Sequence, residues 1–460
     1  MMFKIALRSI FRNARRTFTT MLTIAVGMAA ILVFTAYALY DVYILQTTTV
    51  ERGGHLTVFS KGYFDFGSGD PAIWGIGDYA AVVRLIKSDH VLAPMTTVVT
   101  PVQFLGGIAE NPTNSGSRTF FATGFVPDDQ ARMQRWNEYG IGEALEKTGL
   151  DEDPSRGVIG FGFARYLGLC EQLRLLDCPK PPKTTPTRDN GNATSQAPQD
   201  FSALAEPAPA QAKASRIDLI AATSGGAPNI VALQIGRVEK QGAKEMDDGY
   251  VVMNLALAQQ LVYGRSEHKV TGIILQLHRT EDISVVRRRL ETLFAARHLN
   301  LEVRDYHEIN TYYGQTLNFF RSMFTFIAVL IGVVVLFTVS NTMGMSVMER
   351  IDEIGTTRAL GVRRGRIRTQ FLLEGSILGM LGASLGVAMA FAAAAMINNS
   401  GLTWTPPGDA HAIPLKLYML GAIDIVIAVW SILILVATVA ALIPANRAAR
   451  LPIVDALRHV

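Results

Sequence analysis

Four long segments without a single charged side chain constrain this sequence more than any other feature. They are the stretches 17–40, 322–348, 375–397 and 425–446. Each is as long as the roughly 20 residues that a helix needs to cross the hydrocarbon core of a membrane, or longer. Apolar helices buried in soluble proteins are the alternative, but their uninterrupted apolar runs are usually shorter. The sequence therefore predicts four transmembrane helices.

The charge content supports this interpretation. Charged residues make up 18% of the 460-residue chain, whereas a soluble globular chain carries roughly 25%. The net charge is only +4, and the basic residues gather beside the apolar segments. This distribution predicts membrane lipids as neighbours and gives no indication of nucleic acid as a partner.

The first apolar segment also has features of a secretory signal peptide. Basic residues precede it, and Ala36-Tyr37-Ala38 offers a small-x-small cleavage pattern. However, the apolar run is longer than the roughly 7–15 residues of a signal core, and it continues as far as Ile44. We therefore expect an uncleaved first helix.

The distribution of lysine and arginine predicts the orientation of the chain. These residues are retained on the cytoplasmic side of a membrane. The stretches 1–16, 349–368 and 445–460 are rich in arginine, whereas 398–418 contains Lys416 as its single lysine or arginine. Both termini and the central loop are therefore expected in the cytoplasm of a cell with this protein in its inner membrane.

The predicted fold class is an α-helical integral membrane protein with four transmembrane helices and an α+β extracytoplasmic domain between the first and second of them. In chain order, we expect a cytoplasmic amphipathic interfacial helix at 1–16, a transmembrane helix at 17–45, the extracytoplasmic domain at 46–317, a transmembrane helix at 318–348, a cytoplasmic coupling loop at 349–368, a transmembrane helix at 369–397, a short extracytoplasmic loop at 398–418, a transmembrane helix at 419–444 and a cytoplasmic tail at 445–460.

The extracytoplasmic region mixes strand and helix patterns. Its content of valine, threonine and phenylalanine predicts strands, at 55–60, 98–104, 118–123, 270–277 and 301–303. A helix is predicted at 283–297, with an apolar face made of Val285, Val286, Leu290 and Leu293. The last two strands and this helix predict a β-α-β unit.

A proline-rich insertion interrupts this domain at about 179–215. Seven of the 19 prolines fall between Pro179 and Pro209, and the segment has too little apolar surface to offset its chain entropy. We expect a mobile insertion, which serves either as an inert linker or as a docking arm for a partner.

The two cysteines, Cys170 and Cys178, lie just before this insertion. An oxidising compartment and an even number of cysteines favour a disulfide. The bridge requires a turn between the two residues, because a continuous helix would hold them too far apart.

No catalytic, cofactor-binding or metal-binding pattern emerges. The chain has no GxxxxGK[ST] phosphate-binding loop, and His307-Glu308 is not followed by a second histidine at the zinc-protease spacing. The stretch 382–386 matches the GxSxG nucleophile pattern, but that chemistry needs a strand and a sharp turn, whereas this match lies in an apolar helix. The sequence therefore does not indicate an enzyme.

The same stretch belongs to a stripe of glycines in the third apolar segment. Small residues at such spacing let helix backbones approach closely in lipid, which predicts tight packing against another helix of this chain or of a partner. The stripe consists of Gly375, Gly379, Gly382 and Gly386. Asp41, Glu374 and Asp424 are expected at span edges, where their side chains reach the interface, and this position disfavours an ion pathway.

The central loop contains a short amphipathic helix candidate at 349–361. We expect Ile351, Ile354 and Leu360 to form an apolar ridge and the charged residues to pair with a soluble partner. A solvated loop whose arginines only set the topology is the alternative. The residues predicted to contact the partner are Glu349, Arg350, Glu353, Ile354, Gly355, Arg358, Ala359 and Gly361.

This loop and the segments after it resemble the MacB/FtsX-like ABC transporter permeases, which are related to the lipoprotein-releasing LolC/LolE permeases. The resemblance rests on the stretches 341–343, 348–350, 353–355, 358–361, 371–374 and 444–450, with weaker support from 158–168 and 236–261.

The resemblance implies a mechanism and a set of partners. Two permeases, either two copies or two related chains, would form a dimer with separate ABC ATPase subunits, which bind ATP and Mg. The loop at 349–368 would transmit ATPase motion to the extracytoplasmic domain for export or extraction of a lipid, lipoprotein, peptide or toxic small molecule. A periplasmic adaptor or a lipoprotein is a further expected partner.

Two alternatives remain open from the sequence. An FtsX-like signal transmitter would control an extracytoplasmic partner without moving cargo. An ATP-independent membrane receptor or scaffold would use the basic loop only to set its topology.

Overall fold

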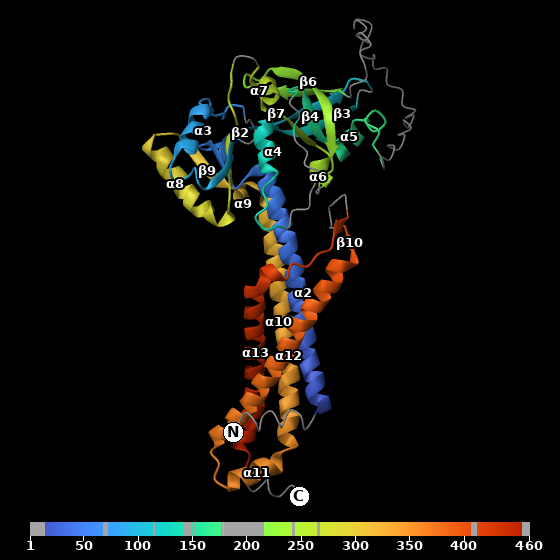
Figure 1. The fold of residues 1–460 in the computed structure, drawn as a ribbon, viewed down its shortest axis with the longest axis vertical. Coiled ribbons are helices and arrows are strands. Elements are labelled where there is room, and N and C mark those ends of the chain that lie inside the picture. Colours follow the sequence, from blue (N-terminus) through green and yellow to red (C-terminus); the bar gives the residue numbers. More distant parts are fainter. Residues whose placement is uncertain are drawn as a thin grey trace, which may run out of the picture.

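The computed structural model describes residues 14–67, 72–113, 116–140, 150, 153–175, 178, 216–241, 244–264, 267–405 and 412–452. The predicted interfacial helix at 1–16 is described only from Ala14, where the first helix begins, and the predicted insertion at 179–215 lies outside the described residues. The described chain forms a long helix bundle with a β-rich domain at one end (Figure 1).

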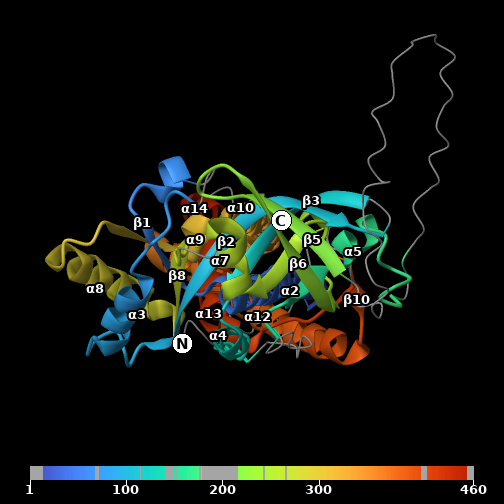
Figure 2. The same ribbon diagram turned by 90° about the horizontal axis from the view of Figure 1, so that it is seen from above.

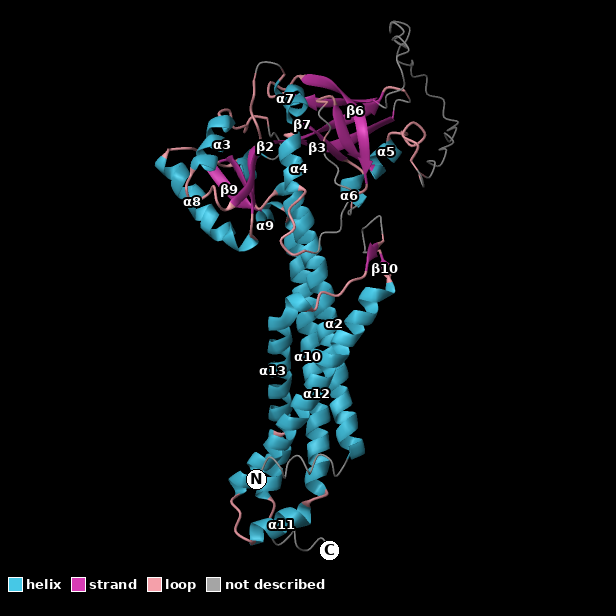
Figure 3. Ribbon diagram, viewed as in Figure 1, coloured by secondary structure: helices cyan, strands magenta, loops and turns pink. Residues whose placement is uncertain are grey.

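Four helices of the described chain are long and apolar enough to cross a membrane. They lie side by side in the bundle (Figures 1 and 3). The bundle helices are α2 (Ala14–Gly53), α10 (Thr311–Met348), α12 (Arg364–Ser400) and α13 (Ile423–Ala440), which is followed by α14 (Leu442–Arg450). Both α2 and α10 extend past the predicted spans and reach the β-rich domain (Figure 1).

The glycine stripe of α12 lies at contacts with two neighbouring helices. A Cβ atom on Gly375 would lie 2.6 Å from the Ala441 Cβ, and one on Gly379 would lie 2.7 Å from the Ala437 Cβ of α13. On the other side, a Cβ on Gly382 would lie 2.8 Å from the Ile24 Cβ of α2, and Gly386 is equally crowded by α2. Since no real Cβ tolerates such distances, glycine is what lets α12 sit between α2 and α13.

One part of the β-rich domain is a small two-layer lobe, here called the ferredoxin-like lobe. Its strand order is β2-β8-β1-β9, with every neighbouring pair antiparallel. Helices α3 and α8 pack against the sheet through a shared apolar core, which gives a ferredoxin-like split β-α-β arrangement. Its elements are β1 (Leu56–Ser60), α3 (Tyr79–Ser88), β2 (Thr96–Asn111), β8 (Gly272–Leu277), α8 (Ile283–Ala296) and β9 (Leu301–Asp305).

The predicted β-α-β unit corresponds to β8, α8 and β9. The two strands run parallel to each other with β1 between them, because each pairs antiparallel with β1. The predicted apolar face of α8 was partly wrong. Val286 and Leu290 are buried as expected, but Val285 is exposed, and Phe294 occupies the buried face instead. Phe294 lies four residues after Leu290, one helical turn along the same face.

The other part of the domain is a ring of six strands, here called the barrel lobe. Each strand pairs on both sides, in the order β2-β3-β7-β4-β6-β5 and back to β2. The ring encloses an apolar core that includes Phe120, Ile159 and Leu233. The elements not yet given are β3 (Gly116–Phe125), α4 (Pro127–Met133), β4 (Arg156–Gly160), α5 (Phe161–Tyr166), β5 (Arg216–Ala222), β6 (Pro228–Glu239), α6 (Lys244–Asp247), β7 (Tyr250–Asn254) and α7 (Leu255–Tyr263).

The barrel lobe is an insertion into the ferredoxin-like lobe. Helix α2 leads directly into β1, and β9 leads through α9 (Tyr306–Ile309) into α10, so both chain connections with the bundle enter the ferredoxin-like lobe. Apart from β2, which both lobes share, the barrel elements lie in sequence between β2 and β8. Seen from above, the two lobes lie beside each other over the bundle (Figure 2).

His55 lies at the junction between α2 and β1. It is fully buried, its Nδ1 accepts a 3.0 Å hydrogen bond from the Leu277 backbone N–H, and its Nε2 lies 3.3 Å from the Thr280 hydroxyl. Burial lowers the pKa of His55 to about 3. The imidazole is therefore neutral at physiological pH, which lets Nδ1 act as an acceptor at this junction.

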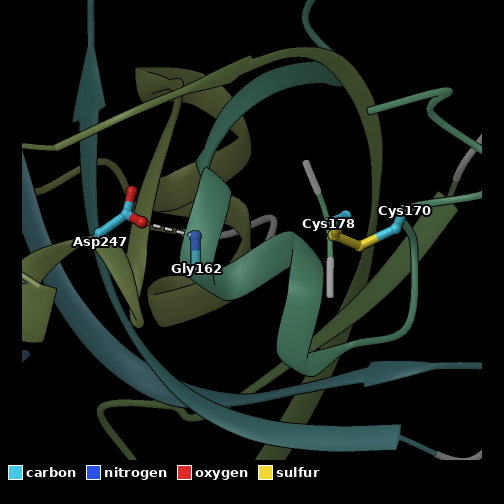
Figure 4. The surroundings of a disulfide bond; sticks show 4 residues. All are labelled: Gly162, Cys170, Cys178 and Asp247. Carbon is cyan, nitrogen blue, oxygen red and sulfur yellow. Dashed lines mark hydrogen bonds between the residues drawn. A yellow bond between two sulfur atoms is a disulfide. The ribbon is translucent and has the colours of Figure 1, made fainter. Parts of the chain in front are cut away.

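Cys170 and Cys178 are joined by a disulfide next to α5 (Figure 4). Their Cα atoms lie 6.1 Å apart, and the chain turns between them, with Arg174 at a φ of 53°. The predicted bridge required a turn between the two cysteines, and the structure contains one.

We expect both cysteines of the purified protein to escape alkylation when free thiols are blocked under denaturing conditions, because neither sulfur is a free thiol. Mass spectrometry of the intact chain would show no added label, and two labels after reduction as the positive control. Two labels without reduction would contradict the bridge.

Candidate functional site

The end of the bundle that is remote from the β-rich domain carries the short helix α11 (Ile351–Ala359) (Figure 1). Asp352 and Glu353 lie in its first turn and Arg358 in its last turn, which complements the helix dipole at both ends. Gly361 follows at a φ of +90°, a conformation that favours glycine and ends the helix.

One face of α11 is anchored in a small apolar core. Ile354 is buried there with Val347 of α10, Phe371 of α12, and Ala445 and Ala448 of α14. Three bundle helices therefore meet at α11, so a displacement of this helix would act on all three.

A buried ion pair fixes the start of α11 to α12. The Arg350 Nη1 donates to the Glu374 Oε1 over 3.0 Å, and the two side chains are 10% and 2% exposed. The prediction that Glu374 reaches the interface was therefore wrong. α12 begins at Arg364, which places Glu374 within the packed part of the helix, where Arg350 turns inward to meet it.

Further polar contacts join the remaining elements at this end. The Arg358 guanidinium donates to the backbone carbonyls of Leu451 and Ala449, which lie in and after α14. Arg16 of α2 forms an ion pair with Glu349 at the end of α10. Hydrogen bonds and ion pairs thus connect the elements at this end of the bundle, from α2 to α14.

The opposite face of α11 is exposed. Glu353 has a 60% exposed side chain that lies 3.8 Å from Arg350, and Leu360 is 83% exposed. The predicted apolar ridge of Ile351, Ile354 and Leu360 does not form, because Ile354 is buried while Leu360 is exposed. Six residues along a helix correspond to a rotation of about 240°, which places these two side chains on different faces.

The eight predicted contact residues therefore fall into two groups. Arg350, Ile354, Gly355 and Arg358 turn toward the bundle, and Glu349 is held at its rim by Arg16. The exposed group consists of Glu353, Ala359 and Gly361.

Sequence reasoning missed two residues of this site. Glu374 was not assigned to it, although a lone acid within a long apolar segment is a signal for a buried partner. Leu360 was assigned to the ridge rather than to the free surface. Its exposure next to four exposed arginines gives this end of the molecule a mixed apolar and basic surface. These arginines are Arg363, Arg364, Arg366 and Arg368.

Comparison with known proteins places this site in a family. Residues 323–453 match the FtsX-like permease C-terminal family model. The chain is 30% identical over 184 residues to a macrolide export ATP-binding/permease protein MacB of Hyphomonas neptunium, which covers 39% of this chain and 28% of the relative.

Two further relatives match over shorter stretches. A MacB of Psychrobacter arcticus is 38% identical over 119 residues, which is 26% of this chain and 16% of the relative. The uncharacterized ABC transporter permease YknZ of Bacillus subtilis is 31% identical over 121 residues, which is 26% of this chain and 27% of the relative. Each of these matches spans less than a third of the relative's length.

The family match includes α11, the Arg350–Glu374 pair and α14. The site at the end of the bundle is therefore part of the region that matches the FtsX-like permease C-terminal model. Over part of its length, the chain is similar to FtsX-like and MacB-related ABC transporter permeases.

Proposed function

We propose that this protein is the permease subunit of an ABC transporter in which a separate ATPase subunit drives motion of the β-rich domain. The observation that carries this proposal is α11, which presents one exposed face at the end of the bundle and anchors the other to three bundle helices. ATP and Mg would be bound by the partner ATPase. The exposed group of Glu353, Ala359 and Gly361, together with Leu360, would contact it.

The proposed orientation places α11 and both termini in the cytoplasm and the β-rich domain outside the inner membrane. The four apolar helices would span the membrane. Exposed arginines gather at the α11 end, at the start of α12 and on α14, as expected for a cytoplasmic face.

A continuous path connects the proposed ATPase contact with the outer domain. A push on α11 would pass through Arg350–Glu374 and the buried Ile354 to α12 and α10. The glycine contacts transmit it from α12 to α2. Since α2 and α10 each continue as long helices to the β-rich domain, their rotation or tilt would move that domain without a channel through the bundle.

Two permeases, either identical or related, would form a dimer in which each chain works in this way. Its cargo would be a lipid, a lipoprotein, a peptide or a toxic small molecule, exported or extracted at the outer face. A periplasmic adaptor or a lipoprotein would meet the β-rich domain there.

The first test is gentle extraction of the tagged chain and identification of the proteins that purify with it. We expect a soluble ATPase at a stoichiometric level. Recovery without any ATPase, under conditions that preserve known transporter complexes, would favour the receptor or scaffold function. ATP-dependent loss of a bound lipid or lipoprotein from the complex would separate transport from signal transmission.

Charge reversal at Glu353 tests the contact itself. We expect Glu353→Lys to uncouple ATP hydrolysis from outer-domain motion. It should also weaken ATPase binding by roughly tenfold, because it places a positive charge against an ATPase surface that is complementary to the negative charge of Glu353. Fold and membrane insertion should be unchanged, since the side chain is 60% exposed. ATPase stimulation by the reconstituted permease measures the effect.

Glu291→Lys is the matched control. Glu291 is likewise an exposed helical glutamate, 57% exposed and 3.7 Å from Arg287, but it lies on α8 of the outer domain. Equal ATPase stimulation by the wild type, Glu353→Lys and Glu291→Lys would refute the assignment of α11 as the contact helix.

A further inference from the structure

The barrel lobe poses a mechanical problem, because both chain connections from the bundle enter the other lobe. The barrel lobe is joined to that lobe through the shared strand β2, and a direct contact with α2 would fix its orientation when α2 moves, as the proposed function requires. The described residues place one such contact at the last turn of α2, where Arg52 reaches the barrel strands.

Arg52 is held by three partners of the barrel lobe. Its guanidinium donates to the Gln241 Oε1, and its Nη2 lies 3.3 Å from the Glu239 Oε1 at the end of β6. The same guanidinium lies 5.6 Å from the centre of the Tyr250 ring at the start of β7. Two neighbouring segments of the barrel therefore converge on one side chain of α2.

The contact continues into the barrel through buried groups. Gln241 is fully buried, and its backbone N–H donates to the Asp247 Oδ1 over 3.0 Å. Asp247 is 3% exposed, and it also accepts hydrogen bonds from the backbone N–H groups of Phe161, at 3.0 Å, and Gly162, at 2.6 Å. Asp247 thus joins the segment after β6 to the start of α5. Figure 4 shows its hydrogen bond with Gly162.

The start of α5 packs so closely against Asp247 and Asp248 that two of its glycines have no room for a side chain. A Cβ atom on Gly160 would collide with the Asp247 backbone carbonyl, and one on Gly162 would collide with the Asp248 carboxylate. Helix α5 then leads to Cys170 and its disulfide with Cys178. The path from Arg52 therefore ends at the disulfide-closed turn of the barrel lobe.

We propose that Arg52 is the positioning residue by which α2 carries the barrel lobe, and that Asp247 extends this connection to α5 and the Cys170–Cys178 turn. The part of this inference that concerns motion rests on the proposed function. The Arg52 side chain is 36% exposed, and exposed ion pairs contribute little to global stability. The role of Arg52 is therefore to fix the position of the lobe rather than to stabilise the fold.

A second contact of α2 with the inserted segment has a different character. Tyr43 stacks on Tyr139 at a ring distance of 4.2 Å, but Tyr139 belongs to the connection after α4 and not to a barrel strand. The Arg52 contact is directional, since it combines a hydrogen bond, an ion pair and a ring contact, whereas stacked rings can slide. Arg52 is therefore the better candidate for fixing the lobe to α2.

Hydrogen–deuterium exchange of the purified full chain tests the positioning role without any ATPase. We expect Arg52→Gln to increase exchange about three- to tenfold in peptides that cover α5 and α6, which is the effect of losing one hydrogen bond of ordinary strength in a local opening. Peptides of β1 and β9 should exchange as in the wild type. Arg52→Lys, which keeps a cation near Glu239 and Gln241, should retain most of the protection.

Arg216→Gln provides the matched control. Arg216 is an exposed arginine of the barrel lobe that pairs with Asp218 of its own strand β5 at 2.8 Å, and its loss should leave α5 and α6 unchanged. Unchanged exchange at α5 and α6 in Arg52→Gln would overturn the proposal. Equally increased exchange in both lobes would also overturn it, since Arg52 would then be a general stabilising residue.

A second measurement repeats the exchange with the partner ATPase, with and without ATP. We expect an ATP-dependent change at α5 and α6 in the wild type and its loss in Arg52→Gln, with the ATPase rate kept within about twofold. An ATP-dependent change that persists in Arg52→Gln would show that α2 moves the lobe by another contact. If ATP changes neither lobe of the wild type, the proposed function fails, while the first measurement still decides the role of Arg52.

Discussion

Replacing Glu374 with alanine is expected to lower the free energy of unfolding of the helix bundle by about 3–5 kcal/mol, because it leaves a buried arginine without its counter-charge. The Arg350 side chain is only 10% exposed and lies 3.0 Å from the Glu374 carboxylate, which is 2% exposed. After the substitution, the guanidinium must either remain buried and uncompensated or pull the start of α11 away from α12. Unfolding by SDS titration, followed by circular dichroism, measures the change.

The double variant Arg350→Met/Glu374→Leu is the control for this prediction. Apolar replacement of both members of a buried ion pair is often neutral or stabilising, so we expect a stability near that of the wild type. ATPase stimulation should nevertheless fall, because the apolar pair lacks the directional link between α11 and α12. A cost below about 1 kcal/mol for Glu374→Ala would show that water reaches the pair and that it does not fix α11.

The helix bundle was largely predictable, whereas the ends of its helices were not. An apolar run of sufficient length identifies a spanning segment whatever its neighbours, because lipid imposes the requirement locally. The last turns of α2, by contrast, contain Gln46 and Thr47, which are polar but buried at the junction with the β-rich domain. Their helical state depends on contacts such as the 2.9 Å hydrogen bond from Gln46 to Thr280, which the sequence does not reveal.

The barrel lobe shows where strand prediction fails. Strands β1, β2, β3, β8 and β9 each overlap a predicted strand, although β2 runs on to Asn111. The short strands β4 and β7 are buried over most of their length, so they lack the alternation that marks a half-exposed strand. Closure of the ring depends on pairs such as β3 with β7, which are far apart in sequence.

The candidate site was predicted at the level of the segment but not of the individual faces. Charges and apolar residues at 349–361 predicted a short amphipathic helix, which the structure shows as α11, and the contact of this helix with a partner stays a prediction. The direction of each side chain depends on how α11 lies against Phe371 and Ala445, both of which come from later segments. For this reason the pairing of Arg350 with Glu374 and the exposure of Leu360 appeared only in the structure.

The second large effect is expected at Gly386. Gly386→Ala should destabilise the bundle by roughly 1–3 kcal/mol, the usual cost of forcing an extra carbon into a packed site. The new Cβ would lie 2.5 Å from the Ala25 carbonyl oxygen and 2.5 Å from the Met28 Cβ, both on α2. Since a backbone oxygen has no alternative rotamer, α12 and α2 must separate. SDS titration again reports the loss of stability.

Gly332→Ala is the matched control, because Gly332 lies in α10 and no atom outside its own stretch of helix would come within 4 Å of its Cβ. There the substitution adds helix propensity without a clash, and we expect a stability equal to that of the wild type or up to about 1 kcal/mol higher. Equal effects of the two substitutions would mean that α12 does not pack closely on α2. A loss of stability in Gly386→Ala alone would instead show that this close contact holds α12 and α2 together. Under the proposed function, the same contact would pass motion of α12 to α2.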